Sequence, residues 1–149
     1  EMYRQLLVAS RKVFQAASRE NVAVVCTYQL ALYLLNQRYL DANCLSNGKQ
    51  IKEVFSEMIY IRPLWEDEYT GERYDCKAYT RGKNADGTWE KFTTPITLDK
   101  TKKYIVAFLD KTRNDEDKQQ ILYEVNFTWN NWREVGFCTI RNEHVQTTR

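Results

Sequence analysis

Glycine, proline and histidine are scarce in this chain of 149 residues, which contains five, two and one of them respectively. With so little glycine, neither the P-loop pattern nor Gly-x-Gly-x-x-Gly occurs, so no phosphate-binding loop is expected. The single histidine, His144, excludes a site built from several histidines, and its place near the end of the sequence predicts a solvated tail. We therefore expect neither a metal nor a cofactor.

Long apolar runs and strong net charge are also absent. The longest apolar stretch, Val22 to Leu35, is broken by Thr27 and Gln29 and is shorter than the roughly 20 residues that a membrane span needs. The net charge of +2 is too small to favour a nucleic-acid partner. Hydrophobic residues make up 43% and charged residues 28% of the chain, which predicts one folded domain over 1–149.

No Cys-x-x-Cys pair occurs among the four cysteines, which makes a zinc ribbon or a thioredoxin-like motif unexpected. The even number and wide spacing of Cys26, Cys44, Cys76 and Cys138 instead permit two disulfides. One possible pairing joins Cys76 to Cys138 and Cys26 to Cys44, although a long helix between Cys26 and Cys44 would forbid the second of these bonds. Four reduced thiols are the alternative.

One glycosylation signal supports an extracellular location. The triplet Asn126-Phe127-Thr128 is an N-glycosylation acceptor pattern. It lies in a predicted strand whose apolar face would be formed by Ile121, Tyr123, Val125, Phe127 and Trp129, leaving Asn126 on the wet face. We expect a secreted protein from this signal and the cysteines; a cytoplasmic location is the alternative.

The glycines and prolines all follow residue 47, which predicts a helical part over 1–60 and a strand-rich part over 73–141. Apolar spacing predicts a helix from Met2 to Ser18 and another from Lys49 to about Ile59. We also predict a central helix from Val22 to about Leu40, capped by Asn21; its β-branched start leaves a buried strand as the alternative.

Alternating segments and turn signals predict antiparallel strands in the second part. The expected strands are Arg73–Arg81, Thr88–Leu98, Lys102–Asp110, Gln120–Asn130 and Trp132–Arg141. Short connections make sequential strands neighbours in a meander. The predicted fold is therefore α+β, with amino-terminal helices packed on a curved antiparallel meander sheet of about five strands.

Two groups of residues are candidate binding surfaces. Arg4, Arg11, Lys12 and Arg19 recur at helical spacing and form one exposed basic stripe, for a partner or as an ordinary polar face. Tyr79, Trp89 and Tyr104 are expected on neighbouring strands, where they would line a concave face for a small ligand. The bland alternative is that these aromatic residues belong to the core.

Acidic residues gather at Trp65-Glu66-Asp67-Glu68-Tyr69, with Glu72 and Asp75 nearby. Paired carboxylates of this kind serve a glycosidase, bind a cationic partner or simply form a solvated loop, and the last is our expectation.

No assembled catalytic motif is present, whereas aromatic residues are abundant. The sequence therefore favours a non-enzymatic secreted binding protein that holds a small ligand or a partner protein. The alternatives are a small enzyme with a cavity lined by carboxylate and tyrosine groups, and an intracellular domain that binds a protein or nucleic acid.

Overall fold

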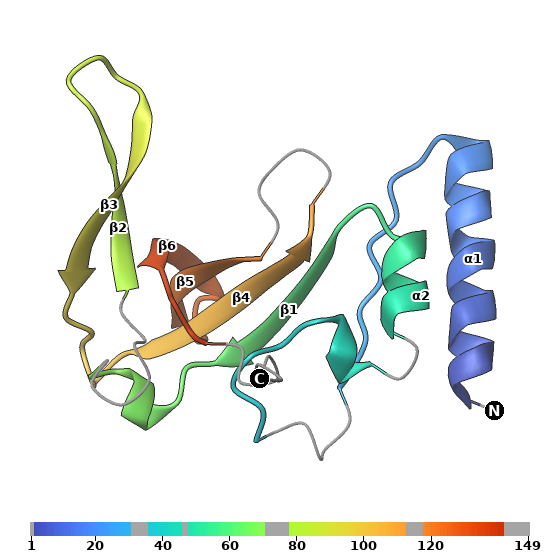
Figure 1. Ribbon diagram of the computed structural model, residues 1–149, viewed down its shortest axis with the longest axis horizontal. Helices are drawn as coiled ribbons and strands as arrows, with labels where there is room; N and C mark the ends of the chain where they lie inside the picture. The colour runs from blue at the N-terminus through green and yellow to red at the C-terminus, as the bar shows by residue number, and fades with distance from the viewer. Residues whose placement is uncertain (1, 31–35, 46–47, 71–77, 113–117, 142–149) are drawn as a thin grey trace, which may run out of the picture.

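The computed structural model describes residues 2–30, 36–45, 48–70, 78–112 and 118–141. These ranges form two α-helices and six strands: α1 Met2–Glu20, α2 Gly48–Val54, β1 Met58–Pro63, β2 Ala78–Lys83, β3 Trp89–Ile96, β4 Lys103–Lys111, β5 Gln119–Asn126 and β6 Asn131–Phe137. Two 3₁₀ turns lie at Ala42–Cys44 and Glu66–Glu68. The predicted α+β class with an antiparallel sheet is confirmed (Figure 1).

The sheet has the strand order β1-β4-β5-β6-β2-β3, and every neighbouring pair is antiparallel. β4, β5 and β6 form the predicted meander. β2 and β3 form a hairpin that joins β6 through a single residue pair, Tyr79 with Phe137. The sheet is therefore a four-stranded unit extended by a loosely attached hairpin.

β1 is the strand that the sequence analysis missed, because Met58 and Ile59 fit a continued helical spacing. The strand instead alternates buried and exposed side chains from Met58 to Pro63, with β-branched and aromatic residues suited to a sheet edge. β1 pairs with one side of β4 and β5 with the other, so β4 has no edge left for β3. This explains why the expected pairing of sequential strands β3 and β4 does not form.

The core lies between one face of the sheet and the helical part. α2 places Ile51 against the sheet, and the irregular segment 36–45 adds Tyr39 and Leu40. These residues pack in one buried cluster with β-strand residues including Phe108 and Leu122. Figure 1 shows α2 between α1 and the sheet, so α1 is the outermost element, and it reaches the core through Leu7.

The predicted helix from Val22 to Leu40 does not form over 22–30, which has no regular secondary structure. Asn21 adopts φ 52° and the N–H of Val22 donates to the carbonyl of Ala17, the closing geometry of a helix end. Asn21 therefore ends α1 instead of capping a second helix. The expectation that this stretch is central is also wrong, since Val25 is 91% exposed. Among the described residues, no helix is long and apolar enough to cross a membrane.

The disulfide prediction is corrected for the cysteines that the structure describes. Cys26, Cys44 and Cys138 all carry thiols, so neither of the expected pairs forms. Cys44 and Cys138 are buried and serve as small apolar core residues. Cys76 lies outside the described residues, as does His144.

A buried polar cluster anchors segment 36–45 to β4 and α2. The carboxylate of Asp110 accepts hydrogen bonds from the backbone N–H of Ala42 at 2.9 Å and from Lys52 at 2.8 Å. Burial raises the pKa values of Tyr39, Cys44 and Tyr60 beside it, and the negative charge of Asp110 adds to this effect.

We expect the free energy of unfolding to fall as the pH rises above about 8.5. Tyr39, Cys44 and Tyr60 keep their protons to higher pH in the folded chain than in the unfolded chain, so ionisation favours unfolding. The stabilisation from these protonated groups is fully present below their pKa values in the unfolded chain, about 8.5 for cysteine and about 10 for tyrosine. It is lost as the pH rises through their pKa values in the folded chain. Urea unfolding between pH about 7.5 and about 10.5 measures the loss, which Tyr60→Phe should reduce. A constant free energy over this range would contradict the expectation.

Candidate functional site

The turn between β5 and β6 presents large aromatic side chains to solvent. We call residues 126–132 the aromatic turn. Phe127 is 65% and Trp129 is 80% exposed, and Trp132 is exposed beside them. The sequence analysis placed Phe127 and Trp129 on the apolar face of a strand, but β5 ends at Asn126. Exposed aromatic groups concentrated in one short segment are typical of an interaction site.

Hydrogen bonds fix the conformation of the aromatic turn. Asn126 Oδ1 accepts from the backbone N–H groups of Thr128 at 3.0 Å and Trp129 at 3.3 Å. Asn130 has φ 46°, in the left-handed region that asparagine tolerates, and its Oδ1 accepts from Trp132 Nε1 at 3.1 Å. A turn held in this way presents its aromatic groups with little conformational entropy left to lose on binding.

The aromatic turn carries no charge, since no Asp, Glu, Lys or Arg occurs from 126 to 132. At its base, Glu124 accepts hydrogen bonds from Arg133 at 2.7 Å and from Lys102 at 3.1 Å. Hydrogen bonds from these two cations lower the pKa of the Glu124 carboxyl, and the bond from Arg133 has the larger effect. The aromatic turn itself is thus uncharged, and the carboxylate at its base is paired with two cations.

The aromatic residues predicted to bind a ligand are not brought together. Tyr104 lies on β4 and Trp89 on β3, which are separated in the sheet by β5, β6 and β2, so the expectation of neighbouring strands is wrong. Tyr104 is buried in the core, where its ring packs against Tyr69 with 5.4 Å between centroids. The backbone of Tyr79 pairs with Pro95 and Phe137.

Trp89 is exposed at the far end of the β2–β3 hairpin. Lys83 is its cross-strand partner, and the ammonium group lies 5.1 Å from the indole centroid. This contact is typical of a cation stacked on a surface aromatic ring. The alternative offered for the aromatic residues, that they belong to the core, therefore holds for Tyr104 and fails for Trp89.

One residue of the acidic run 66–68, Glu68, belongs to a buried ion-pair network, which the expectation of a solvated loop did not foresee. Glu68 is fully buried and accepts two hydrogen bonds from Arg62, at 2.7 and 2.8 Å, and one from Arg38 at 3.1 Å. Both guanidinium groups also lie over the ring of Trp65, at 4.3 and 4.9 Å from its centroid. No signal in the sequence links these arginines to Glu68, because they come from segments far from it or from the missed strand.

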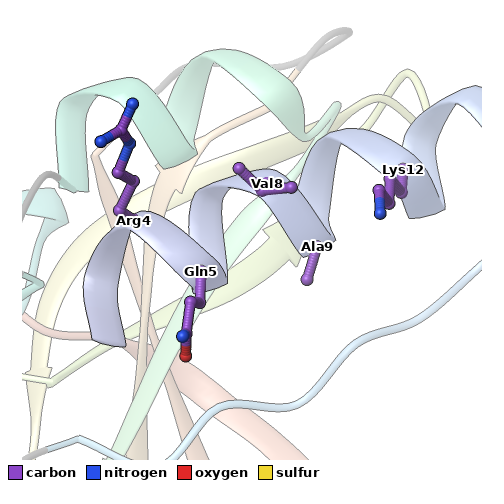
Figure 2. Close-up of a pocket in the computed structure, with 5 residues that line it drawn as sticks. All are labelled: Arg4, Gln5, Val8, Ala9 and Lys12. Carbon is purple, nitrogen blue, oxygen red and sulfur yellow. The ribbon is translucent and has the colours of Figure 1, made fainter. Parts of the chain in front are cut away.

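The basic stripe lies on the solvent face of α1, as expected for Arg4, Arg11, Lys12 and Arg19. Arg4 and Lys12 border a shallow groove that is also lined by Gln5, Val8 and Ala9 (Figure 2). In the ranges that the structure describes, no group of three or more His, Cys, Asp or Glu side chains is arranged to hold a metal ion.

The aromatic turn escaped sequence analysis because its apolar residues continue the alternation of β5. Asn130-Asn131 predicts a tight turn between two strands, but the turn begins earlier, at Asn126, whose side chain accepts from the N–H groups of Thr128 and Trp129. No family model matches the chain, and neither a curated protein nor a solved structure is significantly similar to it.

Proposed function

We propose that this chain is a non-enzymatic binding protein that docks a partner protein through the aromatic turn. The observation that carries the proposal is the 80% exposure of Trp129 in a turn held by hydrogen bonds. Tryptophan contributes more to protein interfaces than almost any other residue, and a rigid presentation favours tight binding. We infer that the partner offers an apolar pocket that takes the indole of Trp129, with Phe127 packed beside it.

The form of the surface favours a partner protein over the small ligand that the sequence analysis also allowed. A small ligand needs a concave site that surrounds it, whereas the aromatic turn projects from the end of a hairpin. Both buried carboxylates among the described residues are held in ion pairs, Glu68 with Arg62 and Asp110 with Lys52. Both observations support a binding role.

A secreted location is proposed separately from docking at the aromatic turn, because it rests on the sequon and a glycan on Asn126 would lie within that turn. Asn126 is exposed at the end of β5, where a glycan would meet no core residue. Disulfides were expected to support this location but do not, because Cys26, Cys44 and Cys138 carry thiols.

We expect Trp129→Ala to weaken partner binding at least tenfold, because truncating a central interface tryptophan costs about 2 kcal/mol or more. To find the partner, p-benzoylphenylalanine placed at position 129 is photo-crosslinked in an extract of the native source, with position 85 in the exposed turn between β2 and β3 as the control site. The captured protein is then purified, and its affinity for the wild type, Trp129→Ala and Phe127→Ala is measured by calorimetry.

Phe14→Ala is the matched control, because Phe14 is another exposed phenylalanine but lies on α1. It should leave the affinity unchanged, and raising the salt from about 0.05 to about 0.5 M should change the affinity little, since the aromatic turn is neutral. Equal capture at positions 129 and 85, or equal affinity for Trp129→Ala, would overturn the proposal. A blue shift of the Trp129 fluorescence on phosphatidylcholine vesicles, with no protein captured, would replace the protein partner by a membrane interface.

A further inference from the structure

The exposed face of α1 carries positive charge that the described residues neutralise only at Arg19. Four cations and no acidic residue occur from Met2 to Arg19. Arg19 pairs with Glu20 at 2.6 Å, but Arg4, Arg11 and Lys12 form no ion pair within the described part of the chain. This face is therefore available to an anionic partner.

The same face contains apolar surface between its cations. We call Arg4, Gln5, Val8, Ala9 and Lys12 the α1 groove. Arg4, Val8 and Lys12 follow one another at four-residue spacing and form one row along the helix, while Gln5 and Ala9 form the adjacent row (Figure 2). Val8 is 46% exposed at the centre of the α1 groove, so a cation stands one turn away on either side of an apolar floor.

We propose that the α1 groove docks an acidic amphipathic helix of a partner protein. Aliphatic side chains of that helix would cover Val8 and Ala9, and carboxylates on its flanks would pair with Arg4 and Lys12. Rows at four-residue spacing are the ridges and grooves through which helices pack on one another, and the 19 residues of α1 offer about five turns for this contact. Opposite charges then orient the two helices and speed their encounter.

The apolar floor distinguishes this partner from other anionic ones. A nucleic-acid backbone would pair with the cations but leave Val8 uncovered. A membrane would need a continuous apolar face, and that face of α1 is already packed inward, with Leu7 buried in the core. A helix with both carboxylates and aliphatic side chains satisfies both features of the α1 groove.

This surface is separate from the aromatic turn. α1 stands at one end of the molecule beyond α2, whereas β5 and β6 lie on the other side of α2 (Figure 1). The two interactions also differ in their response to salt, because binding at the α1 groove is electrostatic and binding at the aromatic turn is not. Failure of one proposal therefore leaves the other standing.

The test uses an 18-residue helical peptide with leucine along one face and glutamate on both flanks, and a scrambled peptide of the same composition. Binding to the full chain is followed by fluorescence anisotropy of the labelled peptide. We expect Arg4→Glu with Lys12→Glu to weaken binding at least tenfold, and Val8→Ser to weaken it about threefold with no change of charge. The affinity should fall steeply as the salt concentration rises.

Lys100→Glu with Lys103→Glu is the matched control, since both lysines are exposed and the double variant changes the net charge by the same amount. It should bind the helical peptide like the wild type. Equal binding of the scrambled peptide, or an equal loss in the control variant, would overturn the proposal. Tighter binding of a single-stranded thymidine oligonucleotide, or of phosphatidylserine vesicles, than of the helical peptide would overturn it in favour of phosphate recognition.

Discussion

Glu68→Ala should lower the free energy of unfolding by about 3–5 kcal/mol, because it leaves Arg62 buried without its anion. Glu68 is fully buried and receives hydrogen bonds from Arg38, Arg62 and the backbone N–H of Trp65. Arg62 is itself buried on β1. Removing the carboxylate therefore takes away the acceptor of these donors without giving them water in its place. The positive charge of Arg62 is then left unpaired in the interior.

Two further variants separate the charge from the packing. Glu68→Gln keeps the shape and one carbonyl acceptor, so we expect it to lose less stability than Glu68→Ala and to fold even if the alanine variant does not. Replacing the pair together, Glu68→Leu with Arg62→Met, should recover part of the loss because no unpaired charge remains. Urea unfolding followed by circular dichroism measures all three.

The matched control is Glu20→Ala, which removes the same kind of side chain from an exposed ion pair with Arg19. We expect it to change the free energy of unfolding by less than about 0.5 kcal/mol, since exposed ion pairs contribute little. If Glu68→Ala is no more destabilising than Glu20→Ala, the buried network does not stabilise β1.

This network shows where sequence reasoning reached its limit. Local patterns predicted α1 and placed β3, β4, β5 and β6 within a few residues, because apolar periodicity and turn signals are local. Local patterns do not reveal the arginine partners of Glu68: Arg38 is 30 residues away in sequence, and Arg62, six residues away, lies on the missed strand. Composition alone therefore predicted that the acidic residues 66–68 form a solvated loop.

The segment after α1 was mispredicted for a different reason. Val22 to Tyr28 reads equally well as a buried helix or a buried strand, and the choice between them assumed that apolar residues must lie inside. The left-handed Asn21 ends α1, and the following valines are largely exposed. Apolar composition therefore did not reveal which residues are buried, and the same is true of Phe127 and Trp129.

Phe108 and Phe127 allow a buried and an exposed apolar side chain to be compared. Phe108→Ala is the second substitution from which we expect a large effect. Phe108 is 1% exposed on β4, and its ring packs edge-on against Tyr39 with 5.2 Å between centroids. The guanidinium of Arg62 lies 5.6 Å from the same ring. We expect the free energy of unfolding to fall by about 3–5 kcal/mol, from lost burial and the cavity left behind.

The contact with Tyr39 gives Phe108 a second role, because it holds the irregular segment 36–45 against the sheet. A double-mutant cycle with Tyr39→Leu should return a coupling of about 0.5–1.5 kcal/mol between the two rings. If the cycle gives no coupling, segment 36–45 is held by its other contacts, which include the burial of Leu40, the hydrogen bond to Asp110 and the ion pair of Arg38 with Glu68.

Phe127→Ala makes the same chemical change at 65% exposure and should alter the free energy of unfolding by less than about 0.5 kcal/mol. Its effect should appear in the affinity for the partner instead, whereas Phe108→Ala, studied below its unfolding temperature, should bind normally. If Phe127 contributes little to folding, its exposed aromatic ring is best explained by partner binding. Loss of affinity without loss of stability at Phe127, and the reverse at Phe108, would support this explanation. A loss of stability at Phe127 equal to that at Phe108 would contradict it.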